Sequence, residues 1–405
     1  MSWVDGAADS LYSVHHLPYG VFSTSDDPSQ RIGVRIGDYV LDLRLLVAGS
    51  TCSGCSTCSA LSAPNLNPLL AAGSEVWAKV RTQLQDALTN VELKSSVEQF
   101  LTPVSKINMH LPFTPADYVD FYSSEHHAIN LGKIFRPDGD PLMPNWKHLP
   151  VGYHGRAGTI VPSGTDIIRP SGQRRTSDGE IMFGPSARLD IEAEVGFVVG
   201  APSRLGTPVS ADAFPEHVFG VVLVNDWSAR DIQSWEYQPL GPFLGKSFAT
   251  SIATWVTPLD ALAAARVPAP EQDPQVLPYL KESDRYGYDL NLSVRWNGTE
   301  VSRPPFGSMY WTPAQQLAHL TANGASLRPG DFYASGTVSG SQPDQRGSFL
   351  ELTWGGSEPL TLEDNAIRTF LADGDTVTIT ATAPGPRGVT IGLGEVTGRI
   401  QPAMT

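Results

Sequence analysis

The chain has 405 residues, with 28 basic and 42 acidic side chains and a formal net charge of −14. This acidic balance argues against a nucleic-acid-binding protein, which usually carries a basic surplus. A hydrophobic content of 41% excludes a disordered chain, and no apolar run is long enough to span a membrane. Three cysteines exclude a disulfide scaffold, and the first 20 residues do not resemble a signal peptide, so we expect a cytoplasmic protein.

The 38 glycines and 33 prolines indicate many turns and favour a β-rich fold over a helical bundle. In residues 20–45, short apolar runs alternate with turns, which predicts a small β meander or barrel. A helix is expected to follow, with Ser74 as its N-cap, because apolar residues recur at helical spacing at Val76, Val80, Leu84 and Leu88. Residues 111–115 are typical of a linker.

The second part of the chain contains clear strand signals. Residues 188–199 alternate between apolar and polar side chains, which predicts a half-buried strand, and residues 221–224 predict a continuous apolar strand. Asn297 and Gly298 predict a hairpin turn. Thr312 and Gln315 predict the capped start of a helix that ends at residues 323–324. Further strands are expected at residues 332–334, 349–353 and 376–382.

Cys52, Cys55 and Cys58 form a C-x2-C-x2-C motif in a segment rich in small polar residues. This spacing can bind zinc or an iron–sulfur cluster. A tetrahedral zinc site needs four ligands, however, and the chain has no fourth cysteine. A flexible surface loop is therefore the favoured interpretation, and metal binding is the alternative.

Four acidic residues have the spacing of a metal site. Glu192 and Glu194 lie two residues apart on a predicted strand, so their side chains leave the same face roughly 6.6 Å apart. A solvated strand face is the simplest explanation for this pair alone. Asp226 ends an apolar strand, and Asp120 stands between bulky apolar residues, which indicates a buried site that needs a partner. Carboxylates alone suit Ca²⁺ or Mg²⁺ rather than zinc.

Histidines are concentrated in one segment. Five of the nine lie between residues 110 and 154, namely His110, His126, His127, His148 and His154. Such clustering is typical of metal binding or general-base chemistry, although a structural role is the alternative for each one. Adjacent residues point in different directions, so we expect at most one of His126 and His127 to be catalytic.

Polar donors follow Asp226 on a predicted helix with Ser228 as its N-cap. Arg230, Gln233 and Tyr237 share one helical face, which suits an oxyanion or carboxylate; a solvated amphipathic helix is the alternative. Lys246 stands between glycine and serine in an apolar stretch, which indicates a positioned cation. Its surroundings do not have the spacing of a nucleotide-binding loop.

Long stretches of the second part of the chain resemble the fumarylacetoacetate hydrolase family. They are DFYSSEHHAINLGKIFR, MPNWKHLPVGYHGRAGTIVPSGT, LDIEAEVGFVVG, VNDWSARDIQSWEYQPLGPFLGKSFATSI and LRPGDFYASGTVSGSQPDQRGSFLELTWGG. The resemblance is weaker over the first 110 residues. It implies a mainly β (α+β) protein, with an N-terminal SH3-like barrel in residues 1–112 and a mixed-β catalytic domain in residues 113–405. It also implies a homodimer.

The resemblance assigns roles to matching positions. The implied metal ligands are Asp120, Glu192, Glu194 and Asp226, with Lys246 and Thr250 beside the metal. His127 matches the general base and Glu351 the acid that orients it. The implied oxyanion donors are Arg230, Gln233 and Lys246. The implied substrate-binding residues are Tyr122, Arg136, Tyr153, Tyr237 and Thr337.

The activity that the resemblance implies is hydrolysis of a carbon–carbon bond in an anionic β-diketo acid. Fumarylacetoacetate would give fumarate and acetoacetate, the last step of tyrosine and phenylalanine catabolism, with Ca²⁺ or Mg²⁺ as cofactor. No nucleic-acid or membrane partner is expected. The nearest alternative is a hydrolase of acylpyruvates or related 2-oxo acids. A second alternative is a scaffold protein that binds metal or a partner through its cysteines.

Overall fold

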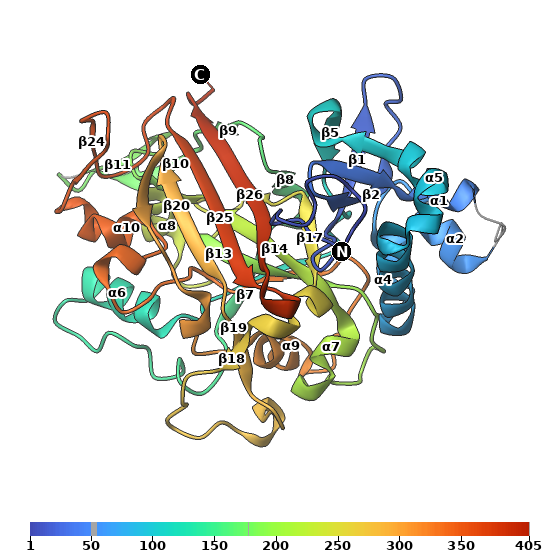
Figure 1. The fold of residues 1–405 in the computed structure, drawn as a ribbon. Coiled ribbons are helices and arrows are strands. Elements are labelled where there is room, and N and C mark those ends of the chain that lie inside the picture. Colours follow the sequence, from blue (N-terminus) through green and yellow to red (C-terminus); the bar gives the residue numbers. More distant parts are fainter. Residues whose placement is uncertain (50–54, 177, 405) are drawn as a thin grey trace.

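The computed structural model describes residues 1–49, 55–176 and 178–404. The protein is a mixed α/β structure in which sheet predominates. Within the described residues, one large sheet of thirteen strands contains both N-terminal and C-terminal segments, and a five-stranded sheet crosses it. Figure 1 shows the two long strands of the smaller sheet, β25 and β26, running in front of β13 and β14.

The N-terminal region contains five strands and a helical layer. Its strands β1, β2 and β3 form an antiparallel meander, which confirms the prediction for residues 20–45. The strands are β1 Tyr19–Thr24, β2 Arg31–Ile36, β3 Tyr39–Asp42, β4 Leu101–Pro103 and β5 Ile107–His110. The helices are α1 Leu43–Ala48, α2 Ser56–Leu61, α3 Asn67–Leu70, α4 Ser74–Thr89 and α5 Lys94–Val97.

Helix α4 confirms the apolar periodicity, because Val80, Leu84 and Leu88 are buried on its inner face. The prediction that Ser74 caps this helix is wrong by one residue. The N-cap is Gly73, whose φ of 85° belongs to the left-handed region that glycine adopts without strain. Ser74 is therefore already the first helical residue.

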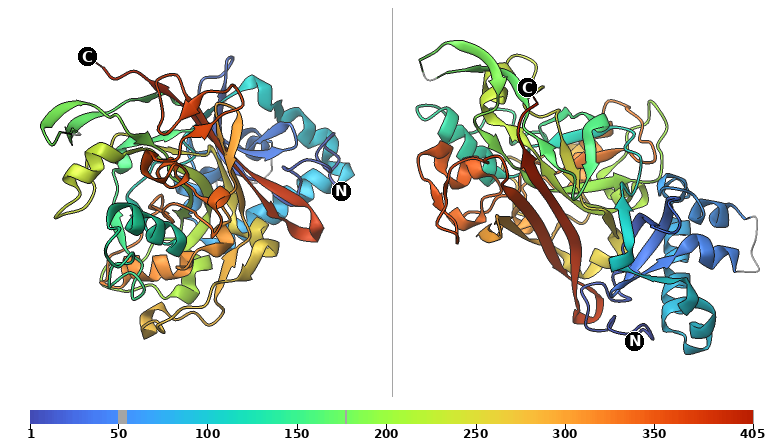
Figure 2. Two further views of the ribbon diagram at one scale, coloured as in Figure 1. Left: turned by 90° about the vertical axis from the view of Figure 1, so that its left-hand side faces the viewer. Right: turned by 90° about the horizontal axis from the view of Figure 1, so that it is seen from above.

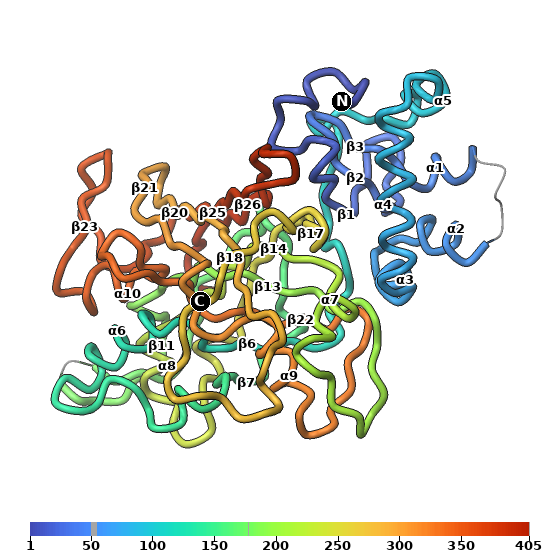
Figure 3. Tube along the Cα trace, turned by 60° about the horizontal axis from the view of Figure 1, so that its bottom comes forward, coloured from blue at the N-terminus to red at the C-terminus, as the bar shows by residue number. Residues whose placement is uncertain are grey.

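The N-terminal strands continue into the large sheet. Strand β1 pairs with β17 (Trp255–Pro258) through Tyr19 opposite Val256 and Gly20 opposite Trp255. A Cβ atom at Gly20 would lie 2.7 Å from the Trp255 ring, so this close approach requires glycine. The strand order is β4-β3-β2-β1-β17-β14-β13-β22-β6-β7. Figure 3 shows β1 next to β17, where the N-terminal part meets the rest of the chain.

The centre of the large sheet is formed by β13 (Ala193–Val199) and β14 (Val218–Asp226), and every residue in both strands is buried. The prediction of a half-buried strand over residues 188–199 is therefore wrong. Strand β13 lies between β14 and β22 (Phe332–Ala334), and β25 and β26 pack against β14. The remaining strands of this sheet are β6 Tyr118–Phe121, β7 Gly152–His154, β8 Ile160–Pro162 and β16 Thr250–Ile252.

The second sheet has the order β21-β20-β25-β26-β9. The predicted hairpin turn between β20 and β21 is confirmed, with φ values of 48° at Asn297 and 87° at Gly298. Its strands are β9 Ile167–Ile168, β20 Asn291–Trp296, β21 Thr299–Ser302, β25 Thr376–Pro384 and β26 Thr390–Gln401. Short paired strands are β10 Ser171–Arg175, β11 Ile181–Pro185, β12 Leu189–Asp190, β15 Ser228–Ala229, β18 Arg266–Pro268, β19 Tyr286–Tyr288, β23 Leu360–Thr361 and β24 Ile367–Arg368.

The helices of the second part of the chain confirm one predicted capping signal and correct another. Thr312 and Gln315 form a capping box at the start of α9. Ser228 is not an N-cap but belongs to β15, and Ala229 caps the following helix. These helices are α6 Glu125–Phe135, α7 Phe214–His217, α8 Arg230–Glu236, α9 Pro313–Thr321 and α10 Phe349–Leu352.

The strand predicted at residues 349–353 is also wrong, because the chain forms helix α10 there. The hydroxyl of Ser348 accepts a hydrogen bond from the backbone N–H of Glu351, which starts a helical turn. Local capping thus outweighs the apolar character of the segment.

The structure describes part of the cysteine motif. Cys52 lies outside the described residues, whereas Cys55 caps α2 and accepts the N–H of Cys58 at 3.2 Å, so this part of the motif is helical rather than a loop. The β10–β11 hairpin extends from the body of the molecule (Figure 2). No helix in the described part of the chain is long and apolar enough to cross a membrane.

Candidate active site

Four buried carboxylates meet at the centre of the large sheet. Asp120 lies on β6, Glu194 on β13, and Asp226 at the end of β14, while Glu192 immediately precedes β13. Each offers one oxygen atom, and these atoms lie within 4.8 Å of one another. Sheet pairing brings them together, since β6 pairs with β22, β22 with β13, and β13 with β14.

Cationic and hydroxyl groups contact this acidic cluster. Lys246 Nζ donates to Glu192 Oε2 at 2.5 Å and to Asp226 Oδ2 at 2.7 Å. Thr250 Oγ1 donates to Asp226 Oδ1 at 2.7 Å, and the hydroxyl of Tyr153 donates to its Oδ2 at 3.3 Å. Lys246 and Thr250 thus reach the cluster through its carboxylates.

The acidic cluster retains unpaired acceptors. Neither carboxylate oxygen of Glu194 nor Oδ1 of Asp120 has a hydrogen-bond partner among the described residues. Burial raises the pKa of both groups well above the usual range, and the neighbouring carboxylates raise it further. Among the described residues, two cationic side chains form ion pairs with the cluster, Lys246 and Arg230. The cluster therefore fits a hard cation with oxygen ligands.

Glu192 has a different environment within the same cluster. Burial raises its pKa, but the charges of Lys246 and Arg230 outweigh this effect and hold the pKa below its usual range. The charge of His127 lowers it as well. Glu192 therefore remains ionised between these cations.

A second group of buried side chains centres on His127. Ser124 is the N-cap of α6, and its hydroxyl accepts the N–H of His127 at 3.2 Å. The imidazole Nδ1 lies 2.7 Å from Glu351 Oε2, and both side chains are buried. Since Nδ1 is engaged, Nε2 is the ring nitrogen that can exchange a proton with a small molecule.

Glu351 accepts further hydrogen bonds from groups that sequence reasoning missed. Asn130 Nδ2 donates to Oε1 at 2.9 Å, while Ser339 and Ser348 donate to Oε2 at 3.0 and 2.8 Å. Burial raises the pKa of Glu351, but the charge of His127 and these hydrogen bonds outweigh it and lower the pKa below its usual value. Asn130 follows His127 by three residues, so helical spacing could have identified it.

Arg230 connects the helix α8 to the acidic cluster. Its Nη1 donates to Glu192 Oε1 at 2.7 Å and to Gln233 Oε1 at 3.2 Å. Its Nε donates to Asp190 Oδ2 at 2.8 Å. Its Nη2 is buried and has no partner in the part of the chain that the structure describes. Sequence reasoning missed Asp190, although this residue shares the alternating face of Glu192.

The predicted substrate-binding residues are divided between two environments. The ring of Tyr122 packs edge-on against His127 with centroids 5.3 Å apart, and Thr337 Oγ1 is buried without a partner among the described residues. Tyr153 contacts the acidic cluster. Tyr237, by contrast, is 42% exposed at the end of α8. Arg136 is exposed, and its Nη2 donates to the Pro141 carbonyl at 2.9 Å.

The other histidines of the segment lie away from the acidic cluster or at its edge. His110 Nε2 lies 2.8 Å from Ser23 Oγ, which is a structural contact in the N-terminal region. His126 is only partly buried, and His148 and His154 are exposed. Of the five, only His127 contacts a buried carboxylate in the described structure.

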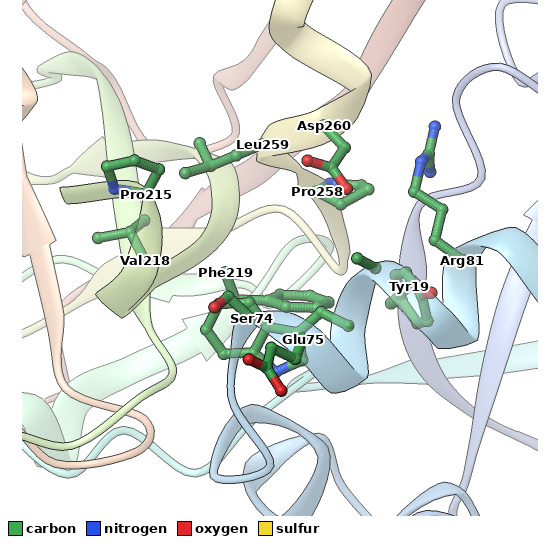
Figure 4. A pocket seen from close by; sticks show the side chains of 12 residues that line it. Tyr19, Ser74, Glu75, Arg81, Pro215, Val218, Phe219, Pro258, Leu259 and Asp260 are labelled. Carbon is green, nitrogen blue, oxygen red and sulfur yellow. The ribbon is translucent and has the colours of Figure 1, made fainter. Parts of the chain in front are cut away.

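Two cavities differ in their relation to the acidic cluster. One of about 150 Å³ reaches Asp226 and Lys246 and is lined by Tyr118, Tyr153 and Arg156, among others. A larger one of about 290 Å³ lies between α4 and the segment around η6 (Leu259–Ala265). Figure 4 shows Arg81 and Asp260 on its walls, but no residue of the acidic cluster.

Comparisons with known proteins assign the chain to a family. The family model of the fumarylacetoacetate (FAA) hydrolase C-terminal region matches residues 118–401, and that of the fumarylacetoacetase N-terminal region matches residues 15–112. Fumarylacetoacetase from Homo sapiens is 47% identical over 420 residues, covering 100% of this chain and 99% of the human protein. Fumarylacetoacetase from Arabidopsis thaliana is 44% identical, covering 99% and 98%. The chain belongs to the fumarylacetoacetate hydrolase family.

Solved structures share the fold at low sequence identity. A fumarylacetoacetate hydrolase from Exiguobacterium antarcticum has a TM-score of 0.57 and 16% identity, covering 96% of this chain and 100% of that chain. A maleylpyruvate hydrolase from Sphingobium sp. SYK-6 has a TM-score of 0.54 and 14% identity, with the same coverage. These likenesses concern the fold alone.

Proposed function

We propose that this protein is a metal-dependent hydrolase that cleaves fumarylacetoacetate into fumarate and acetoacetate, the last step of tyrosine and phenylalanine catabolism. The observation that carries the proposal is that the buried His127–Glu351 pair adjoins the acidic cluster through Tyr122, which packs on His127 and follows Asp120 by two residues. The identity of 47% to human fumarylacetoacetase over the full chain supports the substrate.

His127 acts as the general base in this proposal. Its Nε2 takes a proton from water, and the resulting hydroxide attacks the acyl carbon of the fumaryl group, which becomes a carboxylate of fumarate. Glu351 holds Nδ1 through the 2.7 Å hydrogen bond and stabilises the charge that the imidazole gains. A positioned base contributes about 10²- to 10⁴-fold to the rate.

Arg230, Gln233 and Lys246 stabilise the negative charge that develops on the attacked carbonyl oxygen. Nη2 of Arg230 supports this role, because it is a buried donor with no hydrogen-bond partner among the described residues. The carbon–carbon bond then breaks, and its electron pair leaves with the acetoacetate carbon as an enolate. The proton held by His127 returns to that carbon, so water is added across the broken bond.

The metal ligands in this proposal are Asp120, Glu192, Glu194 and Asp226. When bound, a divalent cation would supply positive charge for the diketone oxygens and for the enolate. Lys246 and Thr250 orient Glu192 and Asp226 by hydrogen bonds. Ca²⁺ and Mg²⁺ are the proposed ions, because both prefer oxygen ligands.

Tyr122, Arg136, Tyr153, Tyr237 and Thr337 are the proposed substrate-binding residues. The substrate is an anion, whereas the chain has a net charge of −14, so local cations must attract it. Arg156 and His154 line the cavity that reaches Lys246, which supports an anionic ligand there. Arg136 and Tyr237 would hold a carboxylate at the exposed side of the site.

The experiment follows fumarylacetoacetate consumption by the purified protein, with and without a chelator, for wild type and His127→Ala. His126→Ala is the matched control, since it changes the neighbouring imidazole. We expect metal-dependent turnover that is lost in His127→Ala and retained in His126→Ala. Turnover of an acylpyruvate but not of fumarylacetoacetate would favour the alternative hydrolase. Loss of bound metal on changing the cysteines, with the acidic residues intact, would favour the scaffold protein.

The domain boundaries, the oligomeric state and the cellular location are also part of the proposal. We infer an SH3-like barrel within residues 1–112 and a catalytic domain in residues 113–405, supported by the meander β1–β3 and the family resemblance. A homodimer is supported by exposed apolar side chains on the β10–β11 hairpin and after α8, including Phe183, Leu240 and Phe243. A cytoplasmic location is supported by the low cysteine content.

A further inference from the structure

Asp190 is a buried carboxylate that the proposed mechanism does not use. Four N–H groups donate to it. Those of Ile191 and Phe349 lie 2.8 Å from Oδ1, the N–H of Leu350 lies 3.1 Å from Oδ2, and Arg230 Nε lies 2.8 Å from Oδ2. Its side chain has no exposed surface. So many donors on one buried carboxylate hold it in a single orientation.

These hydrogen bonds join two parts of the site that are far apart in the sequence. Arg230 begins α8, whereas Phe349 and Leu350 begin α10, whose third residue is Glu351. Asp190 itself pairs with Ser228 in the β12–β15 ladder, two residues before Arg230. One carboxylate therefore fixes the start of both helices.

The contact with Asp190 also determines how Arg230 presents its remaining donor. With Nε on Asp190 and Nη1 on Glu192, the guanidinium plane is held at two nitrogen atoms and cannot rotate. Nη2 is then the donor left without a partner among the described residues. Without Asp190, Nε would be free to turn toward the acidic cluster, and Nη2 would change direction.

We propose that Asp190 is a positioning residue that fixes the Arg230 donor and the Glu351 carboxylate relative to each other. This inference rests on the proposed function, since it assumes that Arg230 and Glu351 act in one reaction. Displacement of a reacting group by about 1 Å can cost about 10²-fold in rate, so a shared anchor for both groups matters for turnover more than for binding.

The test compares Asp190→Asn with Asp42→Asn as a matched control. Asp42 is equally buried and has the same kinds of partner, since it accepts Arg31 Nε at 2.5 Å and the N–H of Leu45 in the first turn of α1. We expect both variants to lower the thermal midpoint. Only Asp190→Asn should lower kcat, by about 10- to 100-fold with KM changed less than about threefold.

A double substitution separates positioning from general destabilisation. In a Glu351→Gln background, where the base is no longer oriented by a carboxylate, Asp190→Asn should lower kcat by less than about threefold, because groups that act as a unit are not additive. If Asp190→Asn does not fold, Asp190→Glu replaces it, since the longer carboxylate keeps the charge but displaces Arg230.

Three results would overturn the role of Asp190. The first is an unchanged kcat in a folded Asp190 variant. The second is a loss of kcat in the Glu351→Gln background that is as large as in the wild-type background. The third is an equal loss of kcat in Asp42→Asn. Wild-type protein that does not consume fumarylacetoacetate would instead refute the proposed function, before any variant is measured. The two failures are therefore distinguishable.

Discussion

His127 Nδ1 lies 2.7 Å from Glu351 Oε2, although 224 residues separate the two in the chain. Both side chains are buried, and the carboxylate also accepts hydrogen bonds from Asn130, Ser339 and Ser348. A histidine with this partner has a fixed ring orientation and a defined free nitrogen. Four predictions follow from this pair and from its surroundings.

Replacing Glu351 should impair turnover without removing the metal site. Glu351→Gln keeps the shape of the side chain but removes the charge that stabilises a protonated His127. We expect kcat to fall by about 10²- to 10⁴-fold, while calorimetry gives an unchanged affinity for Mg²⁺. Glu358→Gln changes an exposed glutamate nearby and serves as the control. A Glu351→Gln protein with near wild-type kcat would exclude His127 as an oriented base.

Asn130 should affect the response of the protein to acid. The pKa of Glu351 is lowered below its usual value of about 4.3, so its ionised form contributes stability above that value and the contribution is lost as the pH falls through the lowered pKa. Asn130→Ala removes one donor and should raise this pKa, which moves acid unfolding to higher pH. At neutral pH we expect Asn130→Ala to lower the free energy of unfolding by about 1–3 kcal/mol.

The measurement for Asn130 is the acid-unfolding midpoint by circular dichroism. Lys133→Ala, an exposed change on the same helix, is the control and should leave the midpoint unchanged. Superimposable acid-unfolding curves for wild type and Asn130→Ala would contradict the prediction.

Metal binding should strengthen as the pH rises. Burial and the neighbouring carboxylates raise the pKa of Asp120 and Glu194, so protons compete with the cation for the acidic cluster. Calorimetry at pH 6 and pH 8, in buffers that differ in ionisation heat, should show a tighter Kd at the higher pH and release of protons on binding. At a concentration of 100 Kd the ion should stabilise the fold by about 2.7 kcal/mol.

Glu194→Gln provides the comparison for the metal experiment, because it removes one charge from the acidic cluster. It should weaken binding and reduce the number of protons released. Equal Kd values at both pH values, with no proton release, would show that the cluster is not the binding site.

Gly132 should be intolerant of a side chain although it lies within a helix. Alanine usually stabilises a helix interior by about 0.5–1 kcal/mol relative to glycine. A Cβ at Gly132, however, would lie 2.0 Å from the Pro141 carbonyl oxygen, which also accepts the hydrogen bond of Arg136. We therefore expect Gly132→Ala to destabilise the protein by about 1–3 kcal/mol and to raise KM through Arg136.

The control for this change is Gly158→Ala, because a Cβ there meets no atom within 4 Å. Thermal unfolding of both variants measures the change in stability, and initial-rate kinetics measure the change in KM. A Gly132→Ala protein that is more stable than wild type, with unchanged KM, would show that the loop of residues 137–143 can move away at no cost.

Sequence patterns predicted those helices and strands that depend on residues close together in the chain. The meander β1–β3, the helix α4 and the capping box of α9 were predicted because periodicity and capping residues are short-range features. The helix α10 was missed, although Ser348 and Glu351 have the spacing of a capping box. Its apolar residues were read as a strand because apolar runs occur in both structures.

Some residues of the candidate active site were predicted from the sequence, and others were missed. Asp120, Glu192, Glu194 and Asp226 were named from the sequence, and the structure brings them together. That Glu192 and Glu194 are buried could not be predicted from alternation, because the pattern does not show that other elements cover both faces of this strand. Of the missed donors to Glu351, Asn130 lies 221 residues away in the chain. Ser348 is only three residues away, but its role depends on a helical turn where a strand was expected.

The pairing of β1 with β17 has a consequence for any attempt to separate the two regions. In the intact chain, β17 has a neighbour on each side, β1 and β14. Cutting the chain at residue 112 would expose a row of N–H and C=O groups along β17 and uncover the Trp255 ring that now packs on Gly20. Bare strand edges recruit other chains, so the isolated C-terminal fragment should self-associate, and the intact protein should unfold as one cooperative unit.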